Sequence, residues 1–208
     1  MKTKIYQYIL LASMVVLYAC GGGNSIKTNE IFGKIPSLVS NFEHADSLHK
    51  AKTENDVKNL KVSELESYLE QFKKEEEDAL TKLKADVKTE RDALKDKPVP
   101  FSVENENFEV KDLKISDEEM NDGKGLKLFF TFEVKKPIEL QPYSNNYVLK
   151  YKILDKDGNQ IEKDKQLTLI LGENYETKIV QPGKKVTQDF YVSLKNPLMV
   201  HFKEIVFF

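Results

Sequence analysis

The most constraining feature of this 208-residue chain is the uneven distribution of proline and glycine. From Ser37 to Lys97 the sequence contains neither residue, whereas six prolines and five glycines occur from Pro98 onward. Both residue types destabilise helix interiors, and both are common in the turns that connect strands. Nine of the twelve phenylalanines also lie after Lys97. The sequence therefore predicts a helical segment over residues 35–97 and a β domain over residues 98–208.

The helical segment contains two series of apolar residues spaced three and four positions apart. The first begins near Pro36, which suits the first turn of a helix, and is interrupted around residues 52–59. The second opens with Ser63 and Glu66, which have the spacing of a capping box, and extends to Lys95. The first series is Leu38, Val39, Phe42, Ala45 and Leu48; the second is Leu65, Leu69, Phe72, Ala79, Leu80, Leu83, Val87 and Leu94, with Glu76 and Glu90 as polar interruptions.

The apolar stripe of the second helix is narrow and needs a partner to exclude water from it. The helix should be roughly 48 Å long at 1.5 Å per residue, and we expect the first helix to be about half as long. The segment is therefore expected to form a helical hairpin or a coiled-coil-like stalk in a monomeric protein. Two alternatives remain open: oligomerisation through the stripe, and a single long helix that only spaces the β domain.

Residues 98–208 alternate between apolar and polar side chains with a period of two, which is typical of strands with one buried face. The Asp157-Gly158 pair predicts a hairpin turn. Seven or eight short strands in about 110 residues predict an antiparallel sandwich of two sheets. The expected strands occupy residues 108–115, 126–134, 147–154, 167–172, 177–180, 187–194 and 201–208.

The β half resembles the immunoglobulin-like domains of bacterial lipoproteins. The resemblance covers residues 100–208 and depends on the segments "LKLFFTFEV", "YVLKYKILDKDGNQI" and "PGKKVTQDFYVSL". This half has no cysteine pair and no tryptophan, so it lacks the disulfide-plus-tryptophan core of antibody domains. The resemblance implies an α+β chain with an immunoglobulin-like sandwich at its C-terminal end, and it implies no reaction.

The N-terminal residues have the organisation of a secretory signal peptide. Lys2 and Lys4 precede a short apolar run that ends near Leu17, and this order of charged and apolar regions is typical of export signals. The run is shorter than the roughly 20 residues that span a bilayer. The sequence predicts a signal peptide over residues 1–19.

The end of this signal, "LYAC", resembles the lipobox of bacterial lipoproteins through Leu17, Ala19, Cys20 and Gly21. Tyr18 departs from the family, which usually has a smaller residue there. The resemblance implies cleavage before Cys20 and attachment of acyl chains such as palmitate to it. Lipidation would explain the only cysteine of an exported chain. The alternative is a secreted protein with a free thiol.

After the lipidated cysteine, the glycine-rich residues up to position 34 are expected to form a flexible tether. The anchor predicts a protein of the outer membrane in the cell envelope. Surface-exported lipoproteins resemble one another in acidic residues directly after the cysteine, whereas the first acid here is Glu30. This difference favours the periplasmic face.

The sequence offers little for catalysis or for cofactors. His44, His49 and His201 do not have the spacing of a zinc site, and no nucleophile elbow, phosphate loop or dinucleotide motif is present. Arg91 is the only arginine of a chain with a net charge of −2, which argues against nucleic-acid binding. We expect no metal, no cofactor and no enzymatic activity. The acidic segment at residues 116–123 is interpreted as a mobile loop.

One segment between two expected strands, residues 135–148, combines prolines with residues that suit binding. Tyr143, Asn145 and Asn146 lie in it, and Tyr175 lies in a later loop. Loops at the ends of a sandwich often carry binding residues, and these side chains combine apolar faces with polar groups. We expect a non-enzymatic binding or assembly module with an envelope protein or a glycan as its partner. The alternatives are a structural spacer without a ligand and an undetected hydrolase.

Overall fold

A computed structural model describes residues 31–176 and 178–208. The predicted signal peptide, Cys20 and most of the predicted tether lie outside these residues. The described elements are α2 (Ile35–Val57), α3 (Val62–Leu94), β1 (Phe101–Val103), β2 (Phe108–Ile115), β3 (Gly125–Val134), β4 (Ile138–Glu139), β5 (Asn146–Asp155), β6 (Lys165–Ile170), β7 (Ile179–Val180), β8 (Lys185–Ser193), the 3-10 helix η1 (Pro197–His201) and β9 (Phe202–Phe207).

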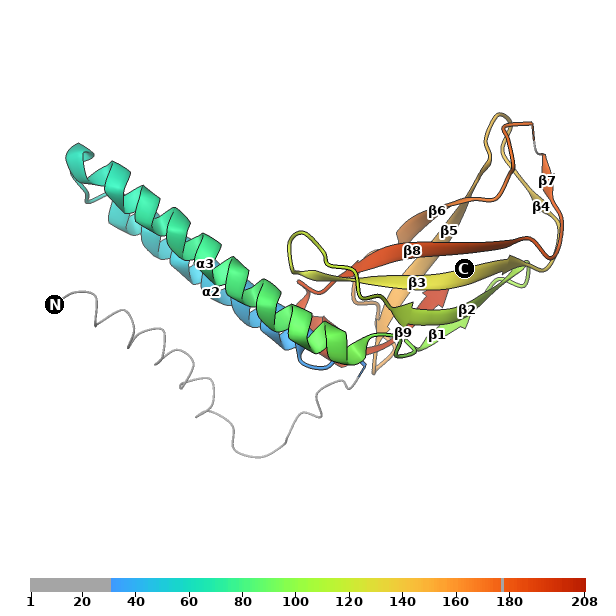
Figure 1. Cartoon of the computed structure of the whole chain (residues 1–208), viewed down its shortest axis with the longest axis horizontal. Coiled ribbons are helices and arrows are strands. Elements are labelled where there is room, and N and C mark those ends of the chain that lie inside the picture. The colour runs from blue at the N-terminus through green and yellow to red at the C-terminus, as the bar shows by residue number, and fades with distance from the viewer. Residues whose placement is uncertain (1–30, 177) are drawn as a thin grey trace.

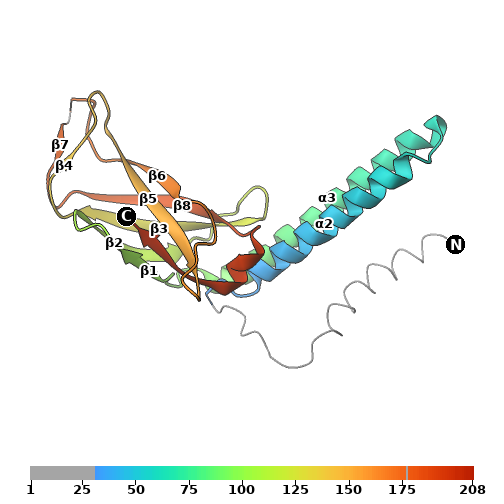
Figure 2. The ribbon, with the colours of Figure 1, turned by 180° about the vertical axis from the view of Figure 1, so that it is seen from behind.

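The molecule is elongated, with α2 and α3 projecting from one end of the β region as an antiparallel pair (Figure 1). The same arrangement is seen from behind in Figure 2, where the short strands β4 and β7 occupy the opposite end of the β region. The prediction of an α+β chain with a helical N-terminal part and a sandwich-like C-terminal part is confirmed.

The strands form a four-stranded sheet in the order β1-β9-β5-β6, a three-stranded sheet in the order β2-β3-β8, and the pair β4-β7. Pairing is antiparallel except between β1 and β9, which are parallel. Rings from the two larger sheets meet in the core: the centroids of Phe130 and Phe207 are 5.5 Å apart, and those of Tyr151 and Phe190 are 5.0 Å apart. The two larger sheets therefore face each other across one aromatic core.

The period-two pattern correctly predicts which strand residues face this core. In β5, Leu149, Tyr151 and Ile153 are buried. In β3 the five alternating residues expected on one face are all fully buried: Leu126, Leu128, Phe130, Phe132 and Val134. The predicted turn at Gly158 is also present, since the Asp155 carboxylate accepts the backbone N–H groups of Asp157 and Asn159 at 2.9 and 2.8 Å. The sequence missed the short elements β1, β4 and η1, which have too few residues to show a period.

The helix boundaries differ from the sequence expectation in two ways. α3 begins at Val62, and its N-cap residue is Lys61, whose side chain makes no capping hydrogen bond within the described residues. The predicted capping box at Ser63 is therefore wrong. α2 continues to Val57 without a break near residue 52 and has 23 residues, against 33 in α3. The expectation that the first helix is half as long as the second is also wrong, because the polar residues near Val57 continue the helix instead of ending it.

Different kinds of side chain pack between the two helices at the base and at the tip of the hairpin. In the hairpin base, which we define as residues 35–42 and 80–94, Val39, Leu83 and Val87 are buried. In the hairpin tip, residues 46–57 and 62–76, contacts between the helices are largely polar. The His49 ring stacks on Phe72 with centroids 4.6 Å apart. The predicted interruption of the stripe at Glu76 is met by the ammonium of Lys50 at 3.4 Å.

The hairpin base shares its core with the sandwich. The rings of Phe32 and Phe202 lie with their centroids 4.6 Å apart. Phe32, Ile35 and Met199 are completely buried in the same apolar cluster as the β strands. The 3-10 helix η1, which carries Met199, contacts α2. The helical and β parts are thus joined by a continuous apolar core at the base, whereas the tip extends away from it.

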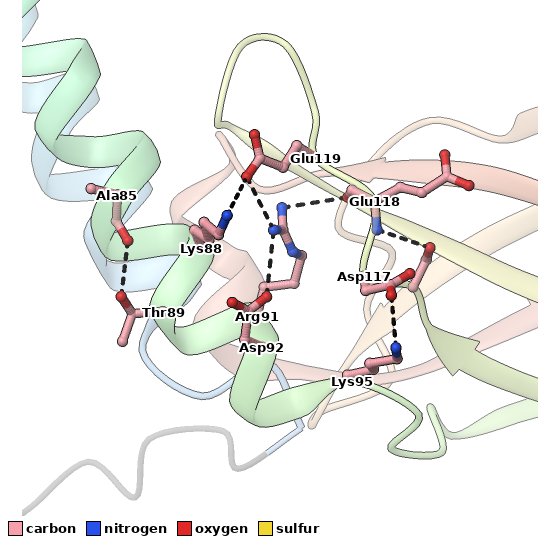
Figure 3. Close-up of polar contacts among 10 residues, drawn as sticks. Ala85, Lys88, Thr89, Arg91, Asp92, Lys95, Asp117, Glu118 and Glu119 are labelled. Atoms are coloured by element: carbon pink, nitrogen blue, oxygen red, sulfur yellow. Dashed lines mark hydrogen bonds and ion pairs between the residues drawn. The ribbon is translucent and has the colours of Figure 1, made fainter.

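The acidic segment between β2 and β3, residues 116–123, lies against α3 (Figure 3), and the interpretation of this segment as mobile stays a prediction. The side chains that it meets are three cations one helical turn apart. Lys95 binds the Asp117 carboxylate at 2.7 Å, and Lys88 lies 3.4 Å from the Glu119 carboxylate. These lysines hold the pKa values of Asp117 and Glu119 below their usual range, mainly through hydrogen bonds to the carboxylates.

Arg91 is the centre of this contact and is only 5% exposed. Its guanidinium donates to the carbonyl oxygen of Glu118 at 3.4 Å and lies 3.5 Å from the carboxylates of Asp92 and Glu119. A second link joins the end of the same loop to α2, since the Lys124 ammonium lies 2.8 Å from the Glu43 carboxylate. The loop from β2 to β3 therefore fixes the direction of both helices relative to the sandwich.

Candidate functional site at the distal loops

The binding residues expected from the sequence lie at the end of the sandwich farthest from the hairpin. We call the segments 141–145 and 171–176 the distal loops; the first joins β4 to β5 and the second follows β6. Both views show the two loops rising together at this end (Figures 1 and 2). The structure therefore brings together two segments that are about thirty residues apart in sequence.

Backbone contacts hold the distal loops against each other. The carbonyl oxygen of Asn145 accepts the N–H groups of Leu171 and Gly172 at 2.9 and 3.0 Å. Gly172 permits this approach, because a Cβ atom on it would lie 3.0 Å from Asn145 Cβ and 3.1 Å from Leu140 Cδ1. Below the loops, β4 and β7 pair through Ile138 opposite Val180. The loops thus form one surface on a short two-stranded support.

Tyr143 has an unfavourable backbone conformation that its surroundings do not explain. The Ser144 N–H donates to the Gln141 carbonyl at 3.1 Å, which closes a four-residue turn with Pro142 in second place. Tyr143 stands third with a φ of 59°, where such turns favour glycine or asparagine. Its side chain is 92% exposed, so core packing does not compensate for the backbone cost of about 1 kcal/mol.

The other predicted site residues have different roles. Tyr175 is 68% exposed in the second distal loop and, like Tyr143, presents its ring to solvent. Asn145 is half-buried, and its backbone joins the loops. Asn146 is exposed in β5 opposite Ile170, and its N–H donates to the Ser144 hydroxyl at 3.1 Å. The two tyrosines are therefore the residues best placed to contact a partner.

The sequence interpretation missed three exposed apolar residues on β5, β6 and β7, the strands that adjoin the distal loops. Val148, Ile170 and Ile179 all point to solvent at this end of the sandwich. Ile170 pairs with Asn146 across the β5–β6 ladder, and Val148 follows two positions later on the same face. The strand pattern could have identified these residues, because they occupy the positions of the alternating segments whose side chains point to solvent. Exposed apolar residues that share a face, as Val148 and Ile170 do, are typical of interaction surfaces.

A rigid aromatic cluster lies beneath this surface. Tyr147 is half-buried, with its ring centroid 5.9 Å from that of Phe132 and 6.3 Å from that of Phe108. Burial raises the pKa of Tyr147, so the phenol stays neutral in the physiological range. These ring contacts anchor β5, the strand that carries Asn146 and Val148.

The histidines do not form a common site in the structure. His44 is exposed on α2, His49 stacks on Phe72, and His201 ends η1. Within residues 31–176 and 178–208, no three His, Cys, Asp or Glu side chains lie close enough together to hold a metal ion. No helix within these two ranges is long and apolar enough to cross a membrane. Comparisons of the chain with protein-family models, curated proteins and solved structures found no match.

Proposed function

We propose that this protein is a lipid-anchored module of the bacterial cell envelope that binds a partner protein through its distal loops without catalysing a reaction. The observation that carries the proposal is Tyr143, an exposed aromatic residue in a backbone conformation that favours glycine. Strained, exposed residues are expected where function rather than stability selects the side chain. The neighbouring apolar residues Val148, Ile170 and Ile179 favour a protein surface over a glycan.

The direction of the chain is consistent with an anchor at Cys20. The first described residues, Ile31 and Phe32, lie at the hairpin base, and Phe32 contacts the sandwich there. The distal loops occupy the opposite end of the sandwich (Figure 1). A tether that starts at an outer-membrane lipid anchor on the periplasmic face would therefore present the loops away from the membrane.

An immunoglobulin-like assignment of the sandwich also belongs to this proposal. The supporting feature is the strand order, in which the antiparallel sheet β2-β3-β8 faces a sheet whose members β9, β5 and β6 are antiparallel neighbours. Chain crossings from β3 to β5 and from β8 to β9 pass between these sheets. In such sandwiches the loops at one end are the usual binding elements.

The first experiment places a photoreactive phenylalanine analogue at Tyr143 or at Tyr175 in intact cells. We expect adducts of a defined mass at both positions, and digestion by protease but not by glycan hydrolases would identify the partner as protein. Val62 is the matched control, because it is 90% exposed but lies at the far end of the hairpin. Adducts at all three positions alike, or at none, would contradict the proposal and favour a structural spacer.

The second experiment replaces Tyr143 by glycine. Relief of the positive φ should leave the free energy of unfolding unchanged or raise it by up to about 1 kcal/mol, whereas capture of the partner should be lost. Tyr143→Phe is the control and should retain most of the binding. A Tyr143→Gly variant that binds normally would show that the residue has no binding role.

The anchor is tested separately by labelling cells with an alkyne fatty acid. The wild-type chain should incorporate the label and sediment with membranes, and Cys20→Ser should do neither. Retention of the label in Cys20→Ser would overturn the lipoprotein assignment without affecting the distal-loop experiments.

A further inference from the structure

The two facing sheets of the sandwich have different numbers of strands. The larger sheet therefore has one strand more than the sheet that it faces. The sheet β1-β9-β5-β6 has four strands, whereas β2-β3-β8 has three. β6 and β8 are the neighbouring edges of the two sheets. A groove of about 370 Å³ lies between these edges, lined by residues of β5, β6 and β8. We call it the β6–β8 groove, and it lies away from the distal loops, toward the hairpin end of the strands.

The register of the sheet shows which backbone groups of β8 face this groove. Leu194 N–H donates to the Lys124 carbonyl, and Val134 N–H donates to the Lys184 carbonyl, so hydrogen-bonded pairs with β3 occur at every even position of β8. In an antiparallel ladder the intervening residues direct their N–H and C=O groups away from the partner strand. Asp189, Tyr191 and Ser193 are these residues, and all three line the groove.

β8 therefore presents an open edge to the groove. It contains no proline, and in the described part of the chain no strand pairs with its outer side. The outward N–H of Tyr191 has no hydrogen bond to another described residue. An exposed edge of this kind is a template for a further strand.

The floor of the groove is largely apolar. Phe190, Ile153 and Tyr151 are buried there, and Leu167 of β6 is only half-buried. Tyr151 is 4% exposed, and its ring forms part of this floor. The Tyr151 hydroxyl is a polar group that a ligand in the groove could meet.

We propose that the β6–β8 groove binds an extended peptide segment of another protein, which adds to the edge of β8 as the fourth strand of its sheet. The peptide would make backbone hydrogen bonds to Asp189, Tyr191 and Ser193. Its side chains on one face, which alternate with outward ones, would cover Leu167 and Phe190 and bring one polar group to the Tyr151 hydroxyl. About five residues of peptide span this part of β8, with apolar side chains at alternate positions.

A free peptide fits this groove better than a second copy of the chain. The inward side chains of a second β8 are already buried in that copy's own core, since Phe190 and Val192 are almost completely covered. Such a copy could pair its backbone with β8 but could not fill the groove above Leu167. A segment without a tertiary structure of its own can do both.

The test selects peptides from a displayed library of nine-residue sequences on the detergent-solubilised full chain. We expect enriched peptides with apolar residues at alternate positions, and in a spectrum of the ¹⁵N-labelled chain they should protect the amides of Asp189, Tyr191 and Ser193 from exchange. Absence of enrichment would overturn the proposal. Protection of these amides without added peptide, together with a doubled sedimentation mass, would overturn it in favour of a dimer.

Two variants block the groove by different means. Tyr191→Pro removes an outward N–H while leaving the β3 ladder intact, which edge strands tolerate, and should weaken peptide binding at least tenfold; Tyr191→Thr is its control and should bind normally. Leu167→Trp fills the groove without changing the backbone and should also abolish binding. Equal binding by the wild type and both blocked variants would refute the proposal. Tyr143→Gly should bind these peptides normally, which separates this site from the distal loops.

Discussion

The base and the tip of the helical hairpin are built from the same two helices but are held by different forces. At the base, Val39, Leu83 and Val87 are buried in a core shared with the sandwich, and the acidic loop binds the last turns of α3. At the tip the contacts between helices include a ring stack, exposed ion pairs and a hydrogen bond from the Tyr68 hydroxyl to the Asp56 carboxylate at 2.9 Å. Exposed ion pairs contribute little to stability, whereas each buried apolar side chain contributes roughly 1.5–3 kcal/mol.

This comparison shows that the hairpin is not a stalk of uniform rigidity. Its direction is set at the base, where Arg91 and the acidic loop join α3 to the β2–β3 connection. The tip depends on helix propensity and on a few polar contacts, so it should open locally far more often than the base. Partners that need a fixed geometry are therefore expected at the sandwich rather than at the hairpin tip.

The largest expected effect on stability comes from introducing an aspartate at a seam position, once in the hairpin base and once in the hairpin tip. Val87→Asp buries an unpaired carboxylate at the base and should lower the free energy of unfolding by roughly 3–5 kcal/mol. Phe72→Asp at the half-buried seam of the tip should cost about 1–2 kcal/mol. Denaturant unfolding followed by far-UV and near-UV circular dichroism measures both. Equal losses would show that the two halves form one cooperative unit, and a Phe72→Asp variant that converts a dimer to a monomer would restore the oligomerisation alternative.

The next effect concerns Arg91 and tests whether its guanidinium is needed for more than its charge. Lysine keeps the charge but cannot reach Glu118, Asp92 and Glu119 together, so Arg91→Lys should destabilise the chain by about 1–3 kcal/mol. Arg91→Met, which packs in the same space without a buried charge, should cost less. Thermal unfolding of the two variants measures these losses. An Arg91→Lys variant as stable as the wild type would show that the several contacts of the guanidinium contribute nothing to stability.

A smaller effect is expected on acidification. Because the pKa values of Asp117 and Glu119 are lowered in the folded chain, their stabilisation is complete above their usual values of 3.8 and 4.5 and is lost as the pH falls through the lowered values. The melting temperature of the wild type should therefore fall below about pH 4.5 more steeply than that of an Asp117→Asn, Glu119→Gln variant. Parallel melting curves for the two proteins would contradict this account.

Glu133, on the sandwich, also contributes to the loss of stability at low pH. A variant of this residue separates its contribution from that of Asp117 and Glu119. Hydrogen bonds from Lys135 and Lys111 lower its pKa to about 2 on the outer face of the sheet. Glu133→Gln should remove the part of the acid dependence that persists below the range of the loop carboxylates. The hairpin base should be unaffected, as its amide exchange rates would show.

The smallest expected effect is at the tip. Lys50 lies 2.9 Å from the Asp46 carboxylate and 3.4 Å from that of Glu76, but more than half of its side chain is exposed. Lys50→Ala should therefore change the free energy of unfolding by only a few tenths of a kcal/mol. A loss above about 1 kcal/mol would show that the polar seam stabilises the tip more than the comparison allows.

Much of the fold could be predicted because the informative patterns are local. The alternation in β3 and β5 identified the buried faces, since a strand's side chains alternate whatever the strand pairs with. The absence of proline and glycine identified the helical part. The capping box at Ser63 failed because the motif describes only a few neighbouring residues, and the helix starts two residues earlier than the motif implies, at Val62, without it.

The candidate site was predicted only in part for the same reason. Tyr143 and Tyr175 were found from their residue type and loop context, but the joining of their two loops depends on backbone hydrogen bonds from Leu171 and Gly172 to Asn145. The β6–β8 groove could not be anticipated, because it results from the unequal strand numbers of two sheets. Strand order is a property of long-range pairing and has no local signature.

Arg91 shows the physical limit most clearly. In the sequence it is one of many charged residues on its helix, and helical spacing alone places it near the edge of the apolar stripe. Its burial depends on Glu118, which is 27 positions away and reaches it only because β2 and β3 turn back beside α3. The periods of helices and strands are set by backbone geometry within a few residues. The burial of a charge is set by whichever distant segments pack around it, and this protein's hairpin direction, joined loops and open strand edge all depend on such contacts.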